Sequence, residues 1–200
     1  MELIQFTQFL FGPNRNLNQI IRFNTRQRSY NETVASHIYY VTLYSLILAD
    51  IANKSGHKID TERVLRNAIL HDVEESSSGD VIRTFKIKMA AIYKKISIIA
   101  VEHVFEFLPE KLIDKYVKVW SRMEEWSQSE EPEEVIVDIA DELTGILYCT
   151  EQICMGNSYF KKIRDNYLEK LEKIVKNTPF EPLYEVIIEK LKDTNLCSYD

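Results

Sequence analysis

Two histidines and two aspartates stand out because their side chains are common ligands of divalent metal ions. They are His37, His71, Asp72 and Asp141. They lie far apart in sequence, but helical bundles build metal sites from side chains on facing helices. Two imidazoles and two carboxylates suit a divalent ion such as manganese, cobalt, iron, magnesium or zinc. Such an ion would lower the pKa of a bound water and polarise a phosphoryl oxygen, so the pattern points to hydrolysis of a phosphate ester.

Two acidic residues near these ligands are candidates for proton transfer. Glu75 stands four residues after His71 and three after Asp72, which places it on their side of a helix that continues for one more turn. It could orient or deprotonate the attacking water. Asp80 follows a serine-rich segment and could assist proton transfer to the departing alkoxide. The alternatives are a solvated Glu75 at a helix end and an Asp80 that caps the next helix.

Arg22 and Phe23 are candidates for substrate binding. The arginine offers a planar fork of donors for a phosphate, and the phenylalanine offers a flat apolar surface for a sugar or base. A structural ion pair is the alternative for Arg22. We exclude His57 and His103, because single histidines without a partner pattern are more often ordinary core or surface residues.

Helices must position these residues, because helical periodicity dominates a chain with only five glycines and five prolines. The predicted fold class is all-α, in a single domain. Thr33 is expected to cap a helix that ends near Lys54, and Asp60 or Thr61 to cap the next. The predicted helices cover residues 1–11, 33–54, 60–70, 84–107, 109–126, 134–155, 159–176 and 182–192.

Some segments are expected to be loop or core. Residues 75–80 should form a loop, since serine and glycine disfavour helix interiors. The apolar stretch 38–51 is predicted to be a buried core helix, too short to cross a bilayer, with Tyr39, Tyr40 and Tyr44 in the core.

Composition narrows the class of protein. A formal charge of -6 argues against binding to a nucleic-acid polymer, which depends on a basic surface. The start of the chain lacks the pattern of a signal peptide, and no membrane association is expected. Three cysteines, at 149, 154 and 197, are expected to be reduced thiols in a cytoplasmic protein.

The order of the candidate ligands resembles the H…HD…D signature of HD-domain phosphohydrolases. The surrounding sequence is similar to that of the bacterial YfbR-like 5′-deoxynucleotidases, over roughly residues 17–150. The similar segments are Arg22-Phe23, Val34-Ala35-Ser36-His37, His71-Asp72-Val73-Glu74-Glu75, Gly79-Asp80 followed by Lys86, and Ala140-Asp141-Glu142-Leu143.

The resemblance implies an HD-type bundle and a homodimer. The helices over about 159–193 lie outside the resemblance and are expected to pack on the core. The resemblance also implies that Glu75 positions water, that Arg22 contacts phosphate and that Lys86 belongs to the substrate site. Two positions depart from the family pattern. Phe23 replaces the tryptophan that helps to exclude a ribose 2′-hydroxyl, and Arg83 lies where the family has a proline-rich turn.

The leading functional hypothesis is hydrolysis of deoxynucleoside 5′-monophosphates to nucleoside and phosphate. Because Arg83 adds a cation that could bind a longer phosphate chain, a nucleoside triphosphate or a phosphodiester is the alternative substrate. A nucleotide-binding sensor without turnover is the alternative of another class, and the intact ligand set with Glu75 argues against it.

Overall fold

The computed structural model describes residues 2–123 and 131–192, and every regular element in these ranges is helical. One isolated antiparallel bridge joins Ile21 to Thr33. The prediction of an all-α fold is therefore confirmed. The elements are α1 (Glu2–Leu10), η1 (Pro13–Asn18), α2 (Val34–Lys54), α3 (Thr61–Leu70), α4 (Glu75–Ser78), α5 (Arg83–Lys88), α6 (Ala90–Phe105), α7 (Glu110–Met123), α8 (Pro132–Cys154), η3 (Ser158–Phe160), α9 (Lys161–Val175) and α10 (Glu181–Lys190).

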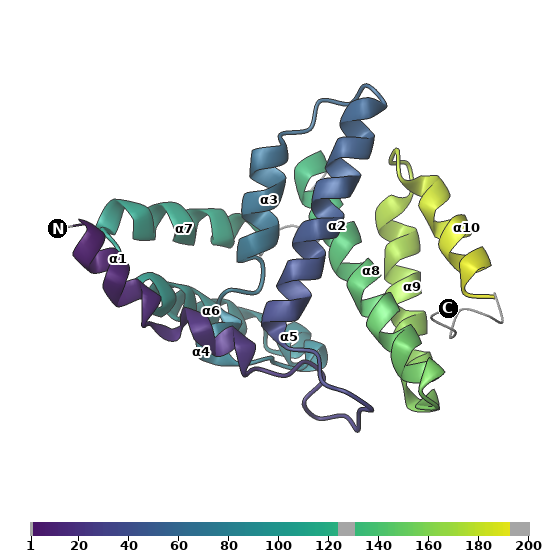
Figure 1. The fold of residues 1–200 in the computed structure, drawn as a ribbon, viewed down its shortest axis with the longest axis horizontal. Coiled ribbons are helices and arrows are strands. Elements are labelled where there is room, and N and C mark those ends of the chain that lie inside the picture. Colours follow the sequence, from purple (N-terminus) through teal and green to yellow (C-terminus); the bar gives the residue numbers. More distant parts are fainter. Residues whose placement is uncertain (1, 124–130, 193–200) are drawn as a thin grey trace.

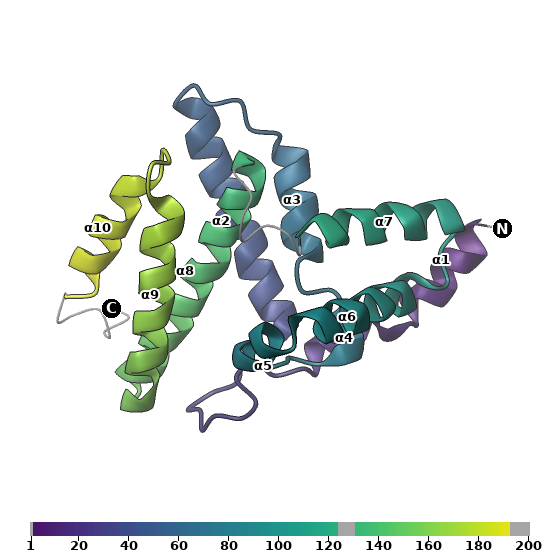
Figure 2. The ribbon, with the colours of Figure 1, turned by 180° about the vertical axis from the view of Figure 1, so that it is seen from behind.

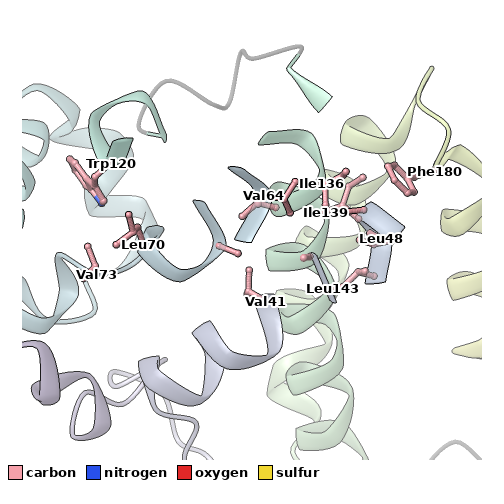
Figure 3. Close-up of a cluster of buried hydrophobic side chains, with 14 of the residues drawn as sticks. Val41, Leu48, Val64, Leu70, Val73, Trp120, Ile136, Ile139, Leu143 and Phe180 are labelled. Atoms are coloured by element: carbon pink, nitrogen blue, oxygen red, sulfur yellow. The ribbon is translucent and has the colours of Figure 1, made fainter. Parts of the chain in front are cut away.

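Helices α2, α3 and α8 form the centre of the molecule (Figure 1). Helix α9 packs along α8, and α10 packs on α9. Helices α4, α5 and α6 lie together near the N-terminal end of α2 (Figure 2). The central helices meet through buried aliphatic side chains, among them Val41, Val64 and Ile139 (Figure 3). The C-terminal helices thus pack on the core, as expected from the sequence.

The starts of the two helices that lead to the site are capped as predicted. The Thr33 hydroxyl accepts a hydrogen bond from the Ser36 amide, and Ser36 returns one to the Thr33 amide, which forms a capping box for α2. Asp60 caps α3 by accepting from the Arg63 amide. These caps fix where His37 and His71 fall along their helices.

The segment 75–80 differs from its prediction, because Glu75–Ser78 forms the short helix α4. Its serine hydroxyls donate to backbone carbonyls: Ser76 to Val73 and Ser78 to Glu74. They therefore satisfy the turn instead of breaking it. The turn ends at Gly79, whose φ of 75° is readily adopted only without a side chain.

The predicted helix over 84–107 is interrupted at Met89, where φ is -118° and ψ is 28°. No glycine or proline marks this break. Further on, Pro109 precedes α7 as predicted, and Trp120 is buried at 1% exposure. The predicted end of this helix at Trp126 lies outside the described residues.

Helix α2 has the predicted bounds but is less buried than predicted. With 21 residues it is the one helix, among those described, that is long and apolar enough to span a membrane, a test that core helices of other proteins also pass. One face, including Val41 and Leu48, lies in the core, but Tyr39 and Tyr40 are 62% and 44% exposed. The expectation that both tyrosines are core residues is wrong, because both side chains are exposed.

The prediction of three reduced cysteines is wrong at Cys154, which is disulfide-bonded. Cys149 is a free thiol in the C-terminal half of α8, buried in a cluster with Tyr148 and Phe160. Cys197 lies outside the described residues.

Candidate active site

The four predicted metal ligands come from three parts of the fold that meet at one point. His37 lies in the second turn of α2, Asp141 in the middle of α8, and His71 and Asp72 directly after the last residue of α3. Because α2 packs against both α3 and α8, the packing of these helices brings the four side chains together.

The distances within this cluster are those of direct contacts. The Nε2 atom of His37 lies 3.1 Å from Asp141 Oδ1 and 3.6 Å from Asp72 Oδ2. His71 Nε2 lies 3.3 Å from Asp72 Oδ2 and 3.2 Å from His37 Nε2. His37, His71 and Asp72 also form one of the groups whose donor atoms are close enough to share a metal ion.

Three contacts, one to the backbone and two to side chains, orient the imidazoles. His71 Nδ1 donates to the Ala68 carbonyl at 2.7 Å, so its Nε2 faces the cluster, an arrangement common in metal-binding histidines. His37 Nδ1 instead accepts from Arg22 Nη1 at 2.7 Å and also contacts Thr144 Oγ1 at 3.1 Å. Because an arginine can only donate, the hydrogen of neutral His37 in this arrangement is on Nε2, which faces Asp141.

The electrostatics divide the two histidines. Burial, followed by the charge of Arg22, lowers the pKa of His37 to about 4. Burial would also lower the pKa of His71, but the Asp72 carboxylate outweighs it and raises that pKa to about 9. The same pairing holds the pKa of Asp72 well below its usual range although burial opposes it. At neutral pH these pKa values favour a positively charged His71 imidazole beside an ionised Asp72 carboxylate.

Arg22 is held by a partner that the sequence did not reveal. Its Nη1 donates to Glu32 Oε2 at 2.8 Å, and the Arg22 side chain is only 12% exposed. The Ile21–Thr33 bridge places the two residues opposite each other, and the Arg22 amide donates to the Glu32 carbonyl. Arg22 thus forms the structural ion pair that the sequence analysis gave as the alternative. It also contacts the cluster through His37.

Phe23 does not present an open ring face to the site. Its ring stacks on Tyr148 at a centroid distance of 5.2 Å and meets the edge of Phe160. Its φ of 54° is unusual for a residue with a large side chain. The Asp80 carboxylate accepts from the Phe23 amide at 3.0 Å, so Asp80 holds the turn that carries Arg22 and Phe23.

Glu75 is near the cluster and buried, at 3% exposure. Lys86 Nζ contacts its Oε1 at 2.8 Å. Burial and then the Asp72 charge raise the pKa of Glu75, whereas Lys86 opposes them. Lys86 therefore binds an acidic side chain of the protein. The side chain of Arg83 lies outside the described part of the structure.

Several residues around the site were missed by reasoning from the sequence: Glu32, Glu74, Thr144, Tyr167 and Lys170. Thr144 had a signal, since it stands three residues after Asp141 on the same helix. Lys170 of α9 pairs with Glu142 and lies 3.7 Å from Asp138, so a C-terminal helix supplies positive charge beside Asp141. No pattern within one helix reveals such a contact between helices.

The overall fold is that of HD-domain phosphohydrolases. One of Listeria innocua superposes with a TM-score of 0.72 at 18% identity, covering 98% of this chain and 92% of that one. The cyanophage S-2L enzyme DatZ, solved with dA and one catalytic Zn²⁺ ion, superposes with a TM-score of 0.64 at 13% identity, covering 89% and 95%. This chain therefore has the architecture of that class.

The sequence comparison defines the family more narrowly. A 5′-deoxynucleotidase of Pectobacterium atrosepticum is 32% identical over 154 residues, which cover 75% of each chain. Residues 9–195 match the family described as 5′-deoxynucleotidase YfbR-like. The chain belongs to this YfbR-like family and is a phosphohydrolase. The match extends well beyond the range 17–150 expected from the sequence and includes α9 and α10.

Proposed function

We propose that this protein hydrolyses deoxynucleoside 5′-monophosphates to nucleoside and phosphate with the help of a divalent metal ion. The observation that carries the proposal is the convergence of His37, His71, Asp72 and Asp141, in which the two Nε2 atoms contact each other and the neighbouring carboxylate oxygens at 3.1–3.6 Å. The naming of curated family relatives as 5′-deoxynucleotidases supports the choice of substrate.

The donor set fits a divalent ion. Two imidazole nitrogens and an Asp72 oxygen lie close enough to share an ion, and Asp141 lies beside His37. The His71 ring is already held with Nε2 toward this group. When bound, the ion supplies a Lewis acid for a phosphoryl oxygen and lowers the pKa of a water. The native ion is one of manganese, cobalt, iron, magnesium or zinc. The zinc found in the related fold of DatZ agrees with this set.

Arg22 has two uses that exclude each other. While it donates to His37 Nδ1, the hydrogen of His37 is on Nε2, the atom that would bind the ion. Binding at Nε2 therefore requires Arg22 to leave Nδ1, and the hydroxyl of Thr144, 3.1 Å away, is positioned to accept the Nδ1 hydrogen instead. The released guanidinium fork is then available for the substrate phosphate.

Glu75 and Asp80 have different positions and different roles. Glu75 is buried close to Asp72, and its raised pKa suits a group that takes up and gives back a proton during the reaction. Asp80 holds the turn that carries Arg22 and Phe23 through the Phe23 amide. We assign it further to proton transfer toward the departing 5′-oxygen, which its place beside that turn supports.

The proposal is tested by measuring phosphate, pyrophosphate and triphosphate release from a panel of ribo- and deoxynucleotides, with each metal supplied in turn. Phosphate release from deoxynucleoside monophosphates, abolished by Asp72→Ala and by chelator, is expected. Selective hydrolysis of triphosphates or of a phosphodiester would move the activity to the alternative substrates on the same site. Nucleotide binding without turnover under any metal would refute the enzyme and leave a sensor.

We also propose that the protein is a cytoplasmic homodimer that binds small nucleotides and neither nucleic-acid polymers nor membranes. Exposed apolar side chains on α2, including Ile47 at 48% and Ile51 at 50%, support a further contact surface. Light scattering on a size-exclusion column tests the dimer. Cell fractionation tests the location. Thiol titration of the protein from cells tests whether the disulfide of Cys154 forms there, since disulfides are rare in the cytoplasm.

A further inference from the structure

A second group of acidic side chains adjoins the predicted metal ligands. Asp72, Glu74 and Glu75 each contribute an oxygen, and these oxygens lie within 4.8 Å of one another. Glu74 and Glu75 are 2% and 3% exposed. Carboxylates gathered in this way repel each other strongly when they are shielded from water, so the group needs a positive charge.

Lys86 supplies this charge. Lys86 lies on α5, and its Nζ lies 2.8 Å from Glu75 Oε1. Its charge also acts on Asp72 and Glu74. Glu74 is fixed from the other side by Trp120, whose Nε1 donates to Glu74 Oε2 at 2.9 Å. The three carboxylates are therefore arranged around an ammonium ion that belongs to the chain itself.

The surroundings of this ammonium resemble a cation site in two further respects. Tyr93 on α6 lies beside it, with Nζ 5.2 Å from the ring centroid, so an aromatic ring face adds to the carboxylates that surround the charge. Asp72 belongs both to this group and to the group of His37 and His71. Two neighbouring cation positions that share a carboxylate are the arrangement of two-metal hydrolytic sites, whose ions lie about 3.5–4 Å apart.

We propose that the Lys86 ammonium occupies the second cation position of this centre and thereby limits the protein to one divalent ion per chain. Removal of the ammonium leaves an oxygen-rich position, formed by Asp72, Glu74 and Glu75, that binds a hard ion such as Mn²⁺. Lys86 is in this view a positioning residue that replaces a metal ion. The inference rests on the proposed function, because it takes the cluster of His37 and His71 as the first metal position.

The test is the stoichiometry of Mn²⁺ binding to metal-stripped protein, measured by calorimetry and by electron paramagnetic resonance. The parent chain and Lys86→Arg, which keeps the charge, are expected to bind one ion with a mononuclear spectrum. Lys86→Met is expected to bind two, with the spectrum of an exchange-coupled pair. Adding Glu74→Gln to Lys86→Met should return the count to one. Lys86→Gln replaces Lys86→Met if that variant fails to fold.

The outcomes separate the two proposals. One ion in the parent and one in the folded charge-removed variant would overturn the role of Lys86 and leave the proposed function intact. Two ions in the parent would also overturn it. No ion in the parent would refute the metal centre itself, and with it both proposals.

Discussion

Arg22 is expected to oppose metal binding while it promotes substrate binding, and its removal should therefore change the two affinities in opposite directions. Arg22 donates to His37 Nδ1 and must leave it before His37 Nε2 can bind an ion. A hydrogen bond to a charged group contributes about 1.5–3 kcal/mol. At about 1.4 kcal/mol per factor of ten, removal of Arg22 should tighten Mn²⁺ binding roughly 10- to 100-fold.

The same substitution should weaken catalysis. Loss of a charge-assisted contact to the phosphate lowers kcat/KM by roughly 10- to 100-fold. Arg22→Ala alone would leave Glu32, 10% exposed, without its ion-pair partner, and breaking a buried pair in this way costs about 3–5 kcal/mol of stability. The informative protein is therefore Arg22→Ala/Glu32→Gln, compared with Glu32→Gln, which keeps the contact between Arg22 and His37.

The assay is competition for Mn²⁺ between the metal-stripped proteins and a fluorescent chelator, followed by steady-state kinetics on a deoxynucleoside monophosphate. Tighter metal binding together with lower kcat/KM supports the reasoning. Metal affinity in the double variant that equals or falls below that of Glu32→Gln would refute it, because the hydrogen bond from Arg22 to His37 would then not oppose metal binding.

Three further predictions follow from local geometry. Gly145→Ala would place a Cβ 2.4 Å from a ring carbon of Tyr167, so the free energy of unfolding in urea should fall by about 1–3 kcal/mol; an unchanged midpoint would show that α9 shifts freely. Phe23→Ala removes the ring stacked on Tyr148 and should lower the same free energy by about 2–4 kcal/mol, whereas a loss confined to substrate affinity would make Phe23 a binding residue alone. His71, with its pKa raised to about 9, carries a proton at pH 7, so Mn²⁺ binding should release about one proton per chain and tighten about tenfold per pH unit up to pH 9. Calorimetry in buffers of different ionisation enthalpy measures that proton, and pH-independent binding would contradict it.

The main helices and the candidate ligands could be predicted because their signals are local. Thr33 and Asp60 are capping residues directly before apolar periodic segments, and both cap helices in the structure. His37, His71 and Asp141 could be selected because their order resembles the H…HD…D signature, which His57 and His103 do not fit. The convergence of the selected residues follows from the packing of α2 against α3 and α8, which the amphipathic pattern implies only in general terms.

The contacts that modify the ligands could not be predicted, because each joins segments that are distant in sequence. The pairing of Arg22 with Glu32 depends on a single backbone bridge, and that of Lys86 with Glu75 on a helix break at Met89 that no glycine or proline marks. The serine-rich segment was predicted to be a loop because propensity scales do not count hydroxyls that bond back to the preceding turn.

The break at Met89 also has a kinetic consequence. It leaves α5 as an independent helix of six residues, far below the length at which a helix is stable by itself. Of its side chains Thr84, Phe85, Ile87 and Lys88 are exposed, so Lys86 provides much of what holds it to α4. Local opening of α5 should therefore be easier than unfolding of α6, and its amides should exchange with deuterium earlier. Each such opening would bring water to Glu74 and Glu75 while the central helices stay folded.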